Sequence, residues 1–130
     1  MEPTDQPAVR ALQKRLSHAD PGLIDVAVSG PFDGVVAVEN DHILGYAIAL
    51  PGPTTTVSEL VVRPDARREG HGRALVNSLS SAGTDRLVVM TPLDNEPARR
   101  FYERLGFYAD GRTAGFYADG TDALCLTRRE

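Results

Sequence analysis

At 130 residues, the chain is long enough to bury one hydrophobic core but too short for two, so residues 1–130 are expected to form a single domain. Its 14 basic and 18 acidic residues leave a net charge of −4, which argues against nucleic acid as the main partner. The polar start, the single Cys125 and the lack of any apolar run near ~20 residues predict a cytoplasmic protein with no signal peptide, internal disulfide or membrane span.

The first thirty residues hold two candidate helices. Thr4 or Asp5 can cap a helix over residues 6–18, whose apolar side chains recur on one face. Asp20 can begin a second, shorter helix around residues 23–28. Apolar residues in that segment also alternate as they do in a strand, so both readings stay open, although helix is favoured.

Three candidate strands follow. Residues 35–39 and 43–50 flank a turn at residues 40–42, which predicts a hairpin. The Pro-Gly-Pro run at residues 51–53 ends that pair, and residues 55–62 are expected to form the next strand.

The middle of the chain contains one helix and one strand. Apolar periodicity predicts the helix over residues 71–82, with Gly83 as its C-terminal cap. The short apolar run at residues 86–91 is typical of a strand in the buried centre of a sheet.

The last third predicts a helix and two strands. Asn95 can cap a helix over residues 96–105, and Gly106 can end it. Residues 107–128 are interpreted as two strands joined by a turn at Asp119-Gly120. The complete order of elements predicts an α/β fold, a mixed sandwich of helices around one central sheet.

The most informative segment joins the strand at residues 55–62 to the helix at residues 71–82. It contains Gly70 and Gly72, and glycine allows close backbone approach to an anion bound by the free N–H groups of a helix N-terminus. Positive charge surrounds this loop, from Arg63, Arg67, Arg68 and Arg73. A nucleotide-hydrolysing Walker loop is disfavoured, because Gly72 is followed by Arg-Ala and not by Lys-Ser/Thr.

Two motifs resemble the signatures of the GNAT acetyltransferase superfamily. Arg67-x-x-Gly70-x-Gly72 is similar to the loop by which those proteins bind the pyrophosphate of acetyl-coenzyme A. The second motif starts at Asn95 and continues through a helix that contains Phe101-Tyr102-x-x-x-Gly-Phe. The resemblance covers roughly residues 34–128, and the two motifs occur in the usual order.

The resemblance implies an acyl-coenzyme A N-acyltransferase-like fold around one mixed sheet. The superfamily usually opens with a strand before its first helix. Here only Met1–Pro3 precede the first helix, so that strand is expected to be truncated or absent.

The resemblance also assigns the coenzyme site. The expected contacts are backbone groups at the end of a strand, the whole glycine loop and two residues of the second motif. These are Leu60, Val61 and Val62; Arg67, Arg68, Glu69, Gly70, His71, Gly72, Arg73 and Ala74; and Asn95 and Tyr102. No metal is expected, and acetyl-coenzyme A would be a co-substrate.

Two residues are candidates for proton transfer. Tyr102 resembles the superfamily's usual acid for the coenzyme thiolate, although Ala98, Phe101 and Leu105 place it on an apolar helix face where it could be a core residue. Glu59 lies in an apolar strand beside the expected acyl site and could deprotonate the amine. The alternative for Glu59, which we favour at this stage, is a solvent-facing strand residue.

The predicted function is transfer of an acetyl group from acetyl-coenzyme A to a primary amine, which attacks directly in a ternary complex. The acceptor would be a small molecule or a peptidyl amine. The alternative is a catalytically silent module that binds or senses acyl-coenzyme A. Exposed strand edges would suit a homodimer.

Overall fold

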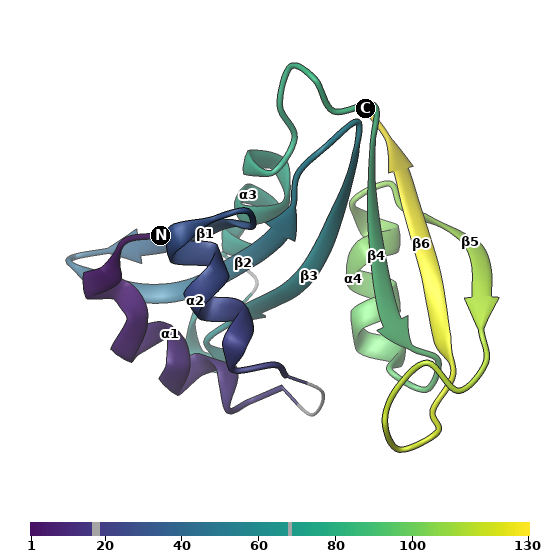
Figure 1. Ribbon diagram of the computed structural model, residues 1–130, viewed down its shortest axis with the longest axis horizontal. Coiled ribbons are helices and arrows are strands. Elements are labelled where there is room, and N and C mark those ends of the chain that lie inside the picture. The colour runs from purple at the N-terminus through teal and green to yellow at the C-terminus, as the bar shows by residue number, and fades with distance from the viewer. Residues whose placement is uncertain (17–18, 68) are drawn as a thin grey trace.

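One mixed six-stranded sheet organises the computed structural model, which describes residues 1–16, 19–67 and 69–130 (Figure 1). The strand order is β1-β2-β3-β4-β6-β5, and only the β3–β4 pair is parallel. The strands are β1 (Asp33–Glu39), β2 (His42–Leu50), β3 (Thr54–Val62), β4 (Arg86–Pro92), β5 (Tyr108–Thr113) and β6 (Ala123–Arg129). The predicted α/β architecture is confirmed, and β4 lies inside the sheet as its apolar sequence indicates.

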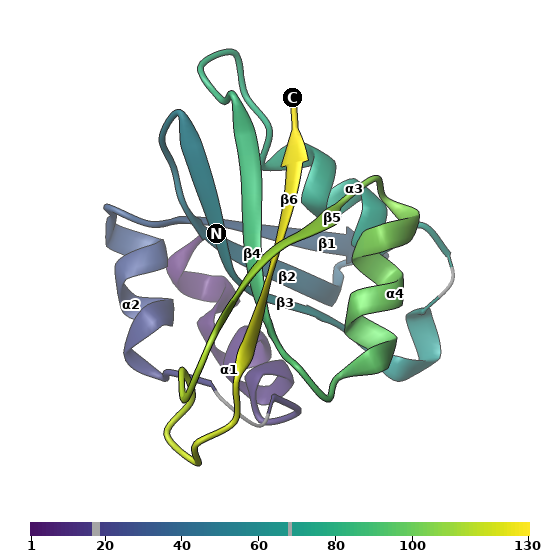
Figure 2. The same cartoon turned by 90° about the vertical axis from the view of Figure 1, so that its right-hand side faces the viewer.

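Four α-helices cover the two faces of the sheet. The helices are α1 (Gln6–Gln13), α2 (Gly22–Ser29), α3 (His71–Ser78) and α4 (Glu96–Arg104). The sheet separates α1 and α2 from α3 and α4 (Figures 1 and 2). Each pair therefore encloses its own apolar core against the sheet.

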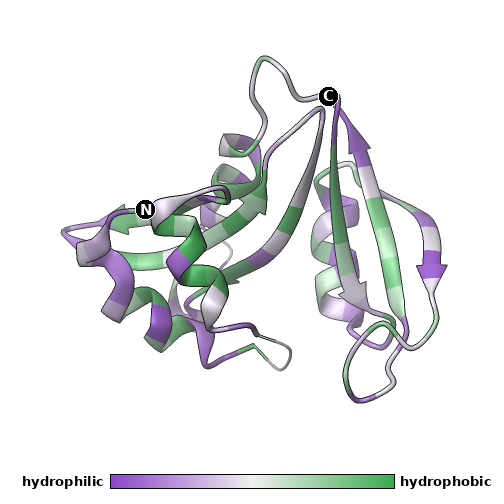
Figure 3. Ribbon diagram, viewed as in Figure 1, coloured by the Kyte–Doolittle hydropathy of each residue, from purple (hydrophilic) through white to green (hydrophobic). Residues whose placement is uncertain are grey.

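Both cores use residues of β2 and β3, but only the core beneath α3 and α4 also contains residues of β4 and β6. Val9 of α1 and Ile24 of α2 pack with Tyr46 of β2. On the opposite face, Leu75 of α3 packs in one cluster with residues of β4 and α4. Figure 3 shows the same division, with apolar residues along the strands and charged residues on the outer faces of the helices. Within the described residues, no helix combines the length and the apolar composition that crossing a membrane requires.

The chain enters helical structure at once. A single 3-10 turn, η1 (Pro3–Asp5), leads into α1, and no strand occurs within residues 1–5. The expectation that residues 1–5 do not form a paired strand is therefore confirmed. The segment at residues 23–28, for which helix and strand both stayed open, belongs to α2 and turns Ile24 and Ala27 inward on one helical face.

Two predicted helices are shorter than expected. α1 ends at Gln13, where the chain turns toward α2. α3 ends at Ser78, and Gly83 is not its cap. Thr84 is hydrogen-bonded to Ser81 through both its backbone N–H and its side chain, so this segment forms a separate turn that competes with further helix.

β3 and β4 pair over only part of their length. Parallel pairing runs from Thr54↔Arg86 to Val57↔Val89 and stops there. At the same point β3 contains a bulge, because Ser58 is skipped in its pairing with β2. Beyond the bulge the two strands diverge toward their C-terminal ends (Figure 1). One edge of β3 is thereby left without a strand partner in the described part of the sheet.

Candidate active site

A cavity of about 160 Å³ lies where β3 and β4 diverge. It is lined by both strands, by one face of α4 and by two residues from elsewhere. These are residues 57–60 of β3, residues 89–92 of β4, Asn95, Ala98 and Tyr102, together with Leu16 and Tyr117. A larger hollow of about 530 Å³ lies between α2, the start of β1 and the end of α3, but it contains none of the predicted site residues.

The glycine loop places a helix N-terminus at the end of β3. The 3-10 turn η2 (Pro64–Ala66) follows the strand, and Gly70 then adopts a left-handed conformation (φ +86°) immediately before α3. The first helical hydrogen bond runs from Ala74 N to Gly70 O at 3.0 Å. The backbone N–H groups of residues 71–73 therefore have no helical acceptor and suit an anionic ligand.

The arginines of the loop have different environments. Arg67 donates from Nε to the backbone oxygen of Val62 at 3.2 Å, which ties the loop to the end of β3. Arg63 is paired with Asp65 at 2.8 Å, whereas Arg73 is exposed on the first turn of α3. Arg68 lies outside the described residues. Arg67 thus has a structural hydrogen bond in addition to its charge.

His71 begins α3 and lies among acidic side chains. Its Nε2 is 3.4 Å from Glu69 Oε1 and 3.9 Å from Glu39 Oε2. These contacts involve the imidazole ring, so the backbone N–H of His71 remains one of the three free donors of the first helical turn.

Gly72 has a packing role that the sequence did not indicate. A Cβ atom at this position would lie 2.9 Å from two ring atoms of Phe101. Glycine is therefore required for α3 to approach α4 this closely. A bulky residue at position 72 would disturb the contact between the two helices, so substitution of Gly72 cannot test ligand binding alone.

Tyr102 is both a core residue and a cavity-lining residue. Its ring packs edge-to-face on Phe101 and Phe107, with centroid distances of 5.0 and 5.3 Å. Its side chain is 5% exposed and belongs to the wall of the cavity. Burial, with a smaller contribution from Tyr117, raises the pKa of the Tyr102 phenol well above its ordinary value, so the phenol is protonated at neutral pH.

Asn95 lies about two helical turns before Tyr102 and also lines the cavity. Its Oδ1 accepts a hydrogen bond from the N–H of Ala98 at 3.2 Å, so the predicted cap is confirmed. The spacing of Asn95, Ala98 and Tyr102 puts all three on one stripe of α4 that faces the cavity.

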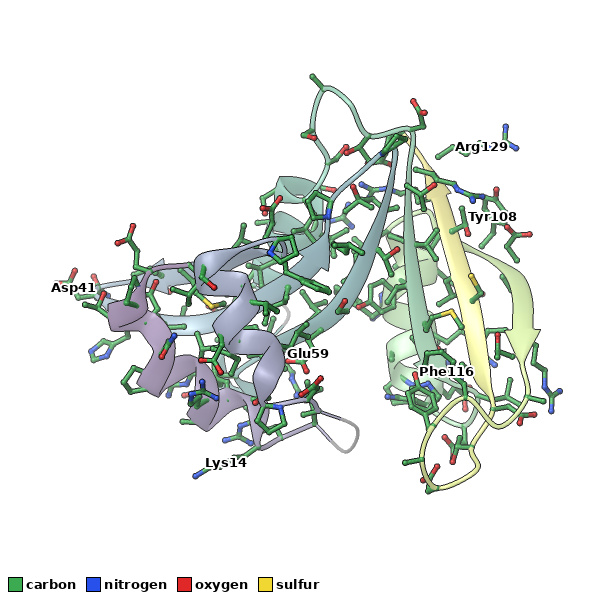
Figure 4. The ribbon with its side chains drawn as sticks, viewed as in Figure 1. Lys14, Asp41, Glu59, Tyr108, Phe116 and Arg129 are labelled. Atoms are coloured by element: carbon green, nitrogen blue, oxygen red, sulfur yellow. The ribbon has the colours of Figure 1, made fainter. Side chains whose placement is uncertain are left out.

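Glu59 is buried, which corrects the expectation that it faces solvent. Its carboxylate accepts hydrogen bonds from Gln13 Nε2 (3.1 and 3.2 Å), the backbone N–H of Asp20 (3.2 Å) and Tyr46 Oη (2.9 Å). Burial and the adjacent Glu59 carboxylate raise the pKa of Tyr46 strongly. Figure 4 shows Glu59 on the α1–α2 side of the divergence and Phe116 on the β4–β6 side.

The bulge at Ser58 explains the orientation of Glu59. Before it, Val57 belongs to the core beneath α3 and α4; after it, Val61 belongs to the core beneath α1 and α2. The extra residue shifts the alternation of β3 by one position. Glu59 consequently lies on the face of Val61, where Gln13 and the segment before α2 cover it.

The three strand residues predicted to contact the coenzyme lie at the end of β3, between the cavity and the glycine loop. Leu60, Val61 and Val62 pair with β2 along one edge of β3. Their other edge faces the divergence, beyond the last pair with β4. β3 thus connects the two groups of predicted site residues, those around the cavity and those at the start of α3.

Residues 31–109, which are more than half of the chain, match the family model of the acetyltransferase (GNAT) domain. The chain belongs to the GNAT acetyltransferase family. The matched segment contains the glycine loop, β3, β4 and all of α4. The resemblance of the two motifs is therefore confirmed at the level of the family.

Individual relatives agree with this assignment. This GNAT chain is 33% identical over 99 residues to N-alpha-acetyltransferase 30 of Schizosaccharomyces pombe, a match that covers 68% of this chain and 66% of that protein. The matched stretch thus spans just under two thirds of the curated relative.

Solved structures confirm the fold. A GNAT-family protein from Desulfovibrio desulfuricans shares 28% identity and superposes with a TM-score of 0.82, covering 98% of this chain and 93% of that one. Arabidopsis thaliana NAA60, solved in complex with acetyl-CoA, has a TM-score of 0.87 at 17% identity and covers 99% of this chain and 95% of that one.

Sequence reasoning did not single out several residues of this candidate site, three of which are polar. Gln13 and Tyr46 fix Glu59, and Thr91 lines the cavity. Gln13 could have been found, because it shares the inward face of α1 with Val9, four residues earlier. Tyr46 and Thr91 lie in strands where only the tertiary neighbours distinguish a site residue from a core residue.

Proposed function

We propose that this chain is an N-acetyltransferase that moves an acetyl group from acetyl-CoA to a primary amine by direct attack in a ternary complex. The observation that carries the proposal is the divergence of β3 and β4. It puts a cavity, an unpaired strand edge and a helix N-terminus in one continuous line. A long ligand with phosphates at one end and a reactive group at the other suits that arrangement.

The residues at the cavity, along the edge of β3 and at the N-terminus of α3 each suit a different part of acetyl-CoA. The N–H groups of residues 71–73 and the exposed guanidinium of Arg73 would bind the pyrophosphate. The free edge of β3 would offer the N–H and C=O groups of residues 60–62 to the amides of the pantetheine arm. Glu69, Gly70 and Ala74 would contribute contacts around the phosphates.

The cavity would supply the proton transfers that aminolysis requires. As the amine nitrogen attacks the thioester carbon, a C–N bond forms, the C–S bond breaks and the nitrogen loses a proton. Glu59 would accept that proton, directly or through water, and Tyr102 would donate its phenolic proton to the departing sulfur. Gln13, the backbone N–H of Asp20 and Tyr46 all donate hydrogen bonds to the Glu59 carboxylate, whose negative charge would also attract an ammonium acceptor.

The acceptor would be a small-molecule amine or the amine of a peptide. The name of the Schizosaccharomyces pombe relative supports a peptide N-terminus. The cavity is small, at about 160 Å³, so only the amine end of a peptide would enter it. Phe116, half exposed in the loop between β5 and β6, would lie at the outer side of the acceptor.

Release of free coenzyme A thiol from acetyl-CoA, measured across a panel of small amines and short peptides, tests this function. Titration calorimetry with acetyl-CoA runs beside it. Binding together with amine-dependent thiol release is the expected result. Binding without release from any acceptor would instead support a silent acyl-CoA module, and absence of binding would contradict both.

Arg73 offers a direct test of the phosphate site. Arg73→Ala and Arg73→Pro both remove the guanidinium, but only proline also removes the backbone N–H, and proline is tolerated in the first turn of a helix. We expect Arg73→Pro to raise the Kd for acetyl-CoA at least about tenfold above that of Arg73→Ala, because a hydrogen bond to a charged group is lost. Circular dichroism would confirm that α3 is retained. Equal Kd values in the two folded variants would exclude this amide from the site.

A further inference from the structure

Thr91, on β4, has a hydroxyl group without a partner. Among the side-chain atoms that the structure describes, its Oγ1 is the one buried nitrogen or oxygen that makes no hydrogen bond. The residue is 4% exposed, and its hydroxyl makes no hydrogen bond to the surrounding protein. A buried hydroxyl without a hydrogen bond destabilises a folded protein, because it has lost its bonds to water.

The hydroxyl groups of two other buried threonines, Thr55 and Thr84, do have hydrogen-bond partners. Thr55 donates to the backbone oxygen of Gly52 at 3.1 Å and lies 3.3 Å from the hydroxyl of Thr84. At position 91 a valine would fill the same volume with no unpaired hydroxyl, and the neighbouring inward positions Leu87 and Val89 are apolar. The hydroxyl of Thr91 is therefore not explained by packing.

The position of Thr91 indicates what could pair with it. Inward residues alternate along β4, so Thr91 lies on the same face as Leu87 and Val89, which pack in the cluster that contains Tyr102. Thr91 also lines the cavity where β3 and β4 diverge, together with Tyr102 and Asn95. A ligand that entered between the strands would meet this hydroxyl.

We propose that the Thr91 hydroxyl forms a hydrogen bond with the acyl-pantetheine arm of the bound coenzyme, through an amide of the arm or through the thioester carbonyl. This inference rests on the proposed function, because that function supplies a ligand with polar groups at this depth. A hydroxyl can donate or accept, so it suits either kind of group. Thr91 is thus a residue that positions the acyl group between β3 and α4.

Thr91→Val tests the inference, since it retains the shape and removes only the hydroxyl. We expect the Kd for acetyl-CoA to rise about tenfold, because the arm loses a hydrogen bond. The melting temperature of the free protein should stay equal or rise, because an unsatisfied group has been removed. The Kd for adenosine 3′,5′-bisphosphate, which lacks the arm, should not change. Thr91→Ser, which keeps a hydroxyl, should bind acetyl-CoA more tightly than Thr91→Val.

Coenzyme A and acetyl-CoA distinguish the two possible partners in the arm. A loss of affinity for both ligands in Thr91→Val assigns the bond to an amide, and a loss for acetyl-CoA alone assigns it to the thioester carbonyl. An unchanged Kd for both ligands would overturn the inference, as would a lower melting temperature or an equal loss for the bisphosphate. If the wild-type protein does not bind acetyl-CoA, the proposed function itself is wrong. The inference about Thr91 would then be wrong as well.

Discussion

Tyr102→Phe should lower turnover at least tenfold, and up to about the 10²–10⁴-fold typical of general acid catalysis. Phenylalanine keeps the ring and with it both edge-to-face contacts, so the core around Phe101 and Phe107 is retained. Only the proton for the departing sulfur is removed. Steady-state kinetics at saturating acetyl-CoA would measure the loss, and calorimetry should show little change in acetyl-CoA affinity.

The pH dependence gives a second measure of the same role. Burial raises the pKa of Tyr102 above its ordinary value of about 10, so the proton-donating form persists to higher pH than in a free phenol. The wild-type rate should therefore show no decline from ionisation of Tyr102 up to about pH 10. Full turnover in a stable Tyr102→Phe variant would show that Tyr102 is a core residue and that water protonates the thiolate.

Glu59→Gln is expected to reduce both turnover and stability. Glutamine cannot accept the proton of the amine, so turnover near neutral pH should fall by about 10²-fold or more. Its amide would also point donors at Gln13 and at the N–H of Asp20, which now donate to the carboxylate. Leaving such groups unpaired in a buried site lowers the free energy of unfolding by about 1–3 kcal/mol, measurable by urea denaturation.

Tyr46→Phe is the matched control for Glu59→Gln. It removes one of the hydrogen bonds to the carboxylate but leaves the proposed base in place. We expect a stability loss of similar origin with turnover reduced only a few-fold. As pH rises, the rate of Glu59→Gln should recover toward wild type, because the acceptor amine then deprotonates in water. A Glu59→Gln variant as active as Tyr46→Phe would exclude Glu59 as the base.

Interactions between residues close in the sequence determine several turns and helix ends of this protein. Asn95 caps α4 through its own side chain, and Gly70 supplies the left-handed residue immediately before α3. Asn40 and Asp41, both with positive φ, form the predicted turn between β1 and β2. Each of these features depends on residues a few positions apart, so they could be predicted from the sequence together with the order of elements and the resemblance of the two motifs.

The repeated hexapeptide Gly-Phe-Tyr-Ala-Asp-Gly shows where local chemistry is insufficient. Its first copy, at residues 106–111, enters β5, because β6 is beside it to pair with Tyr108. The second copy, at residues 115–120, forms a turn in which Gly120 N donates to Tyr117 O at 2.9 Å. One sequence therefore has two conformations, and the availability of a strand partner decides between them.

The details of the candidate site depend on the tertiary structure in the same way. Glu59 is buried because a bulge at Ser58 turns it toward Gln13, which is 46 residues away in the chain. Gly72 must be glycine because of Phe101, on another helix. Thr91 lacks a hydrogen-bond partner because β3 and β4 separate beside it. A sequence pattern records which residues alternate or recur, whereas burial and hydrogen bonding are set by elements that meet only when the sheet and its two helical layers assemble.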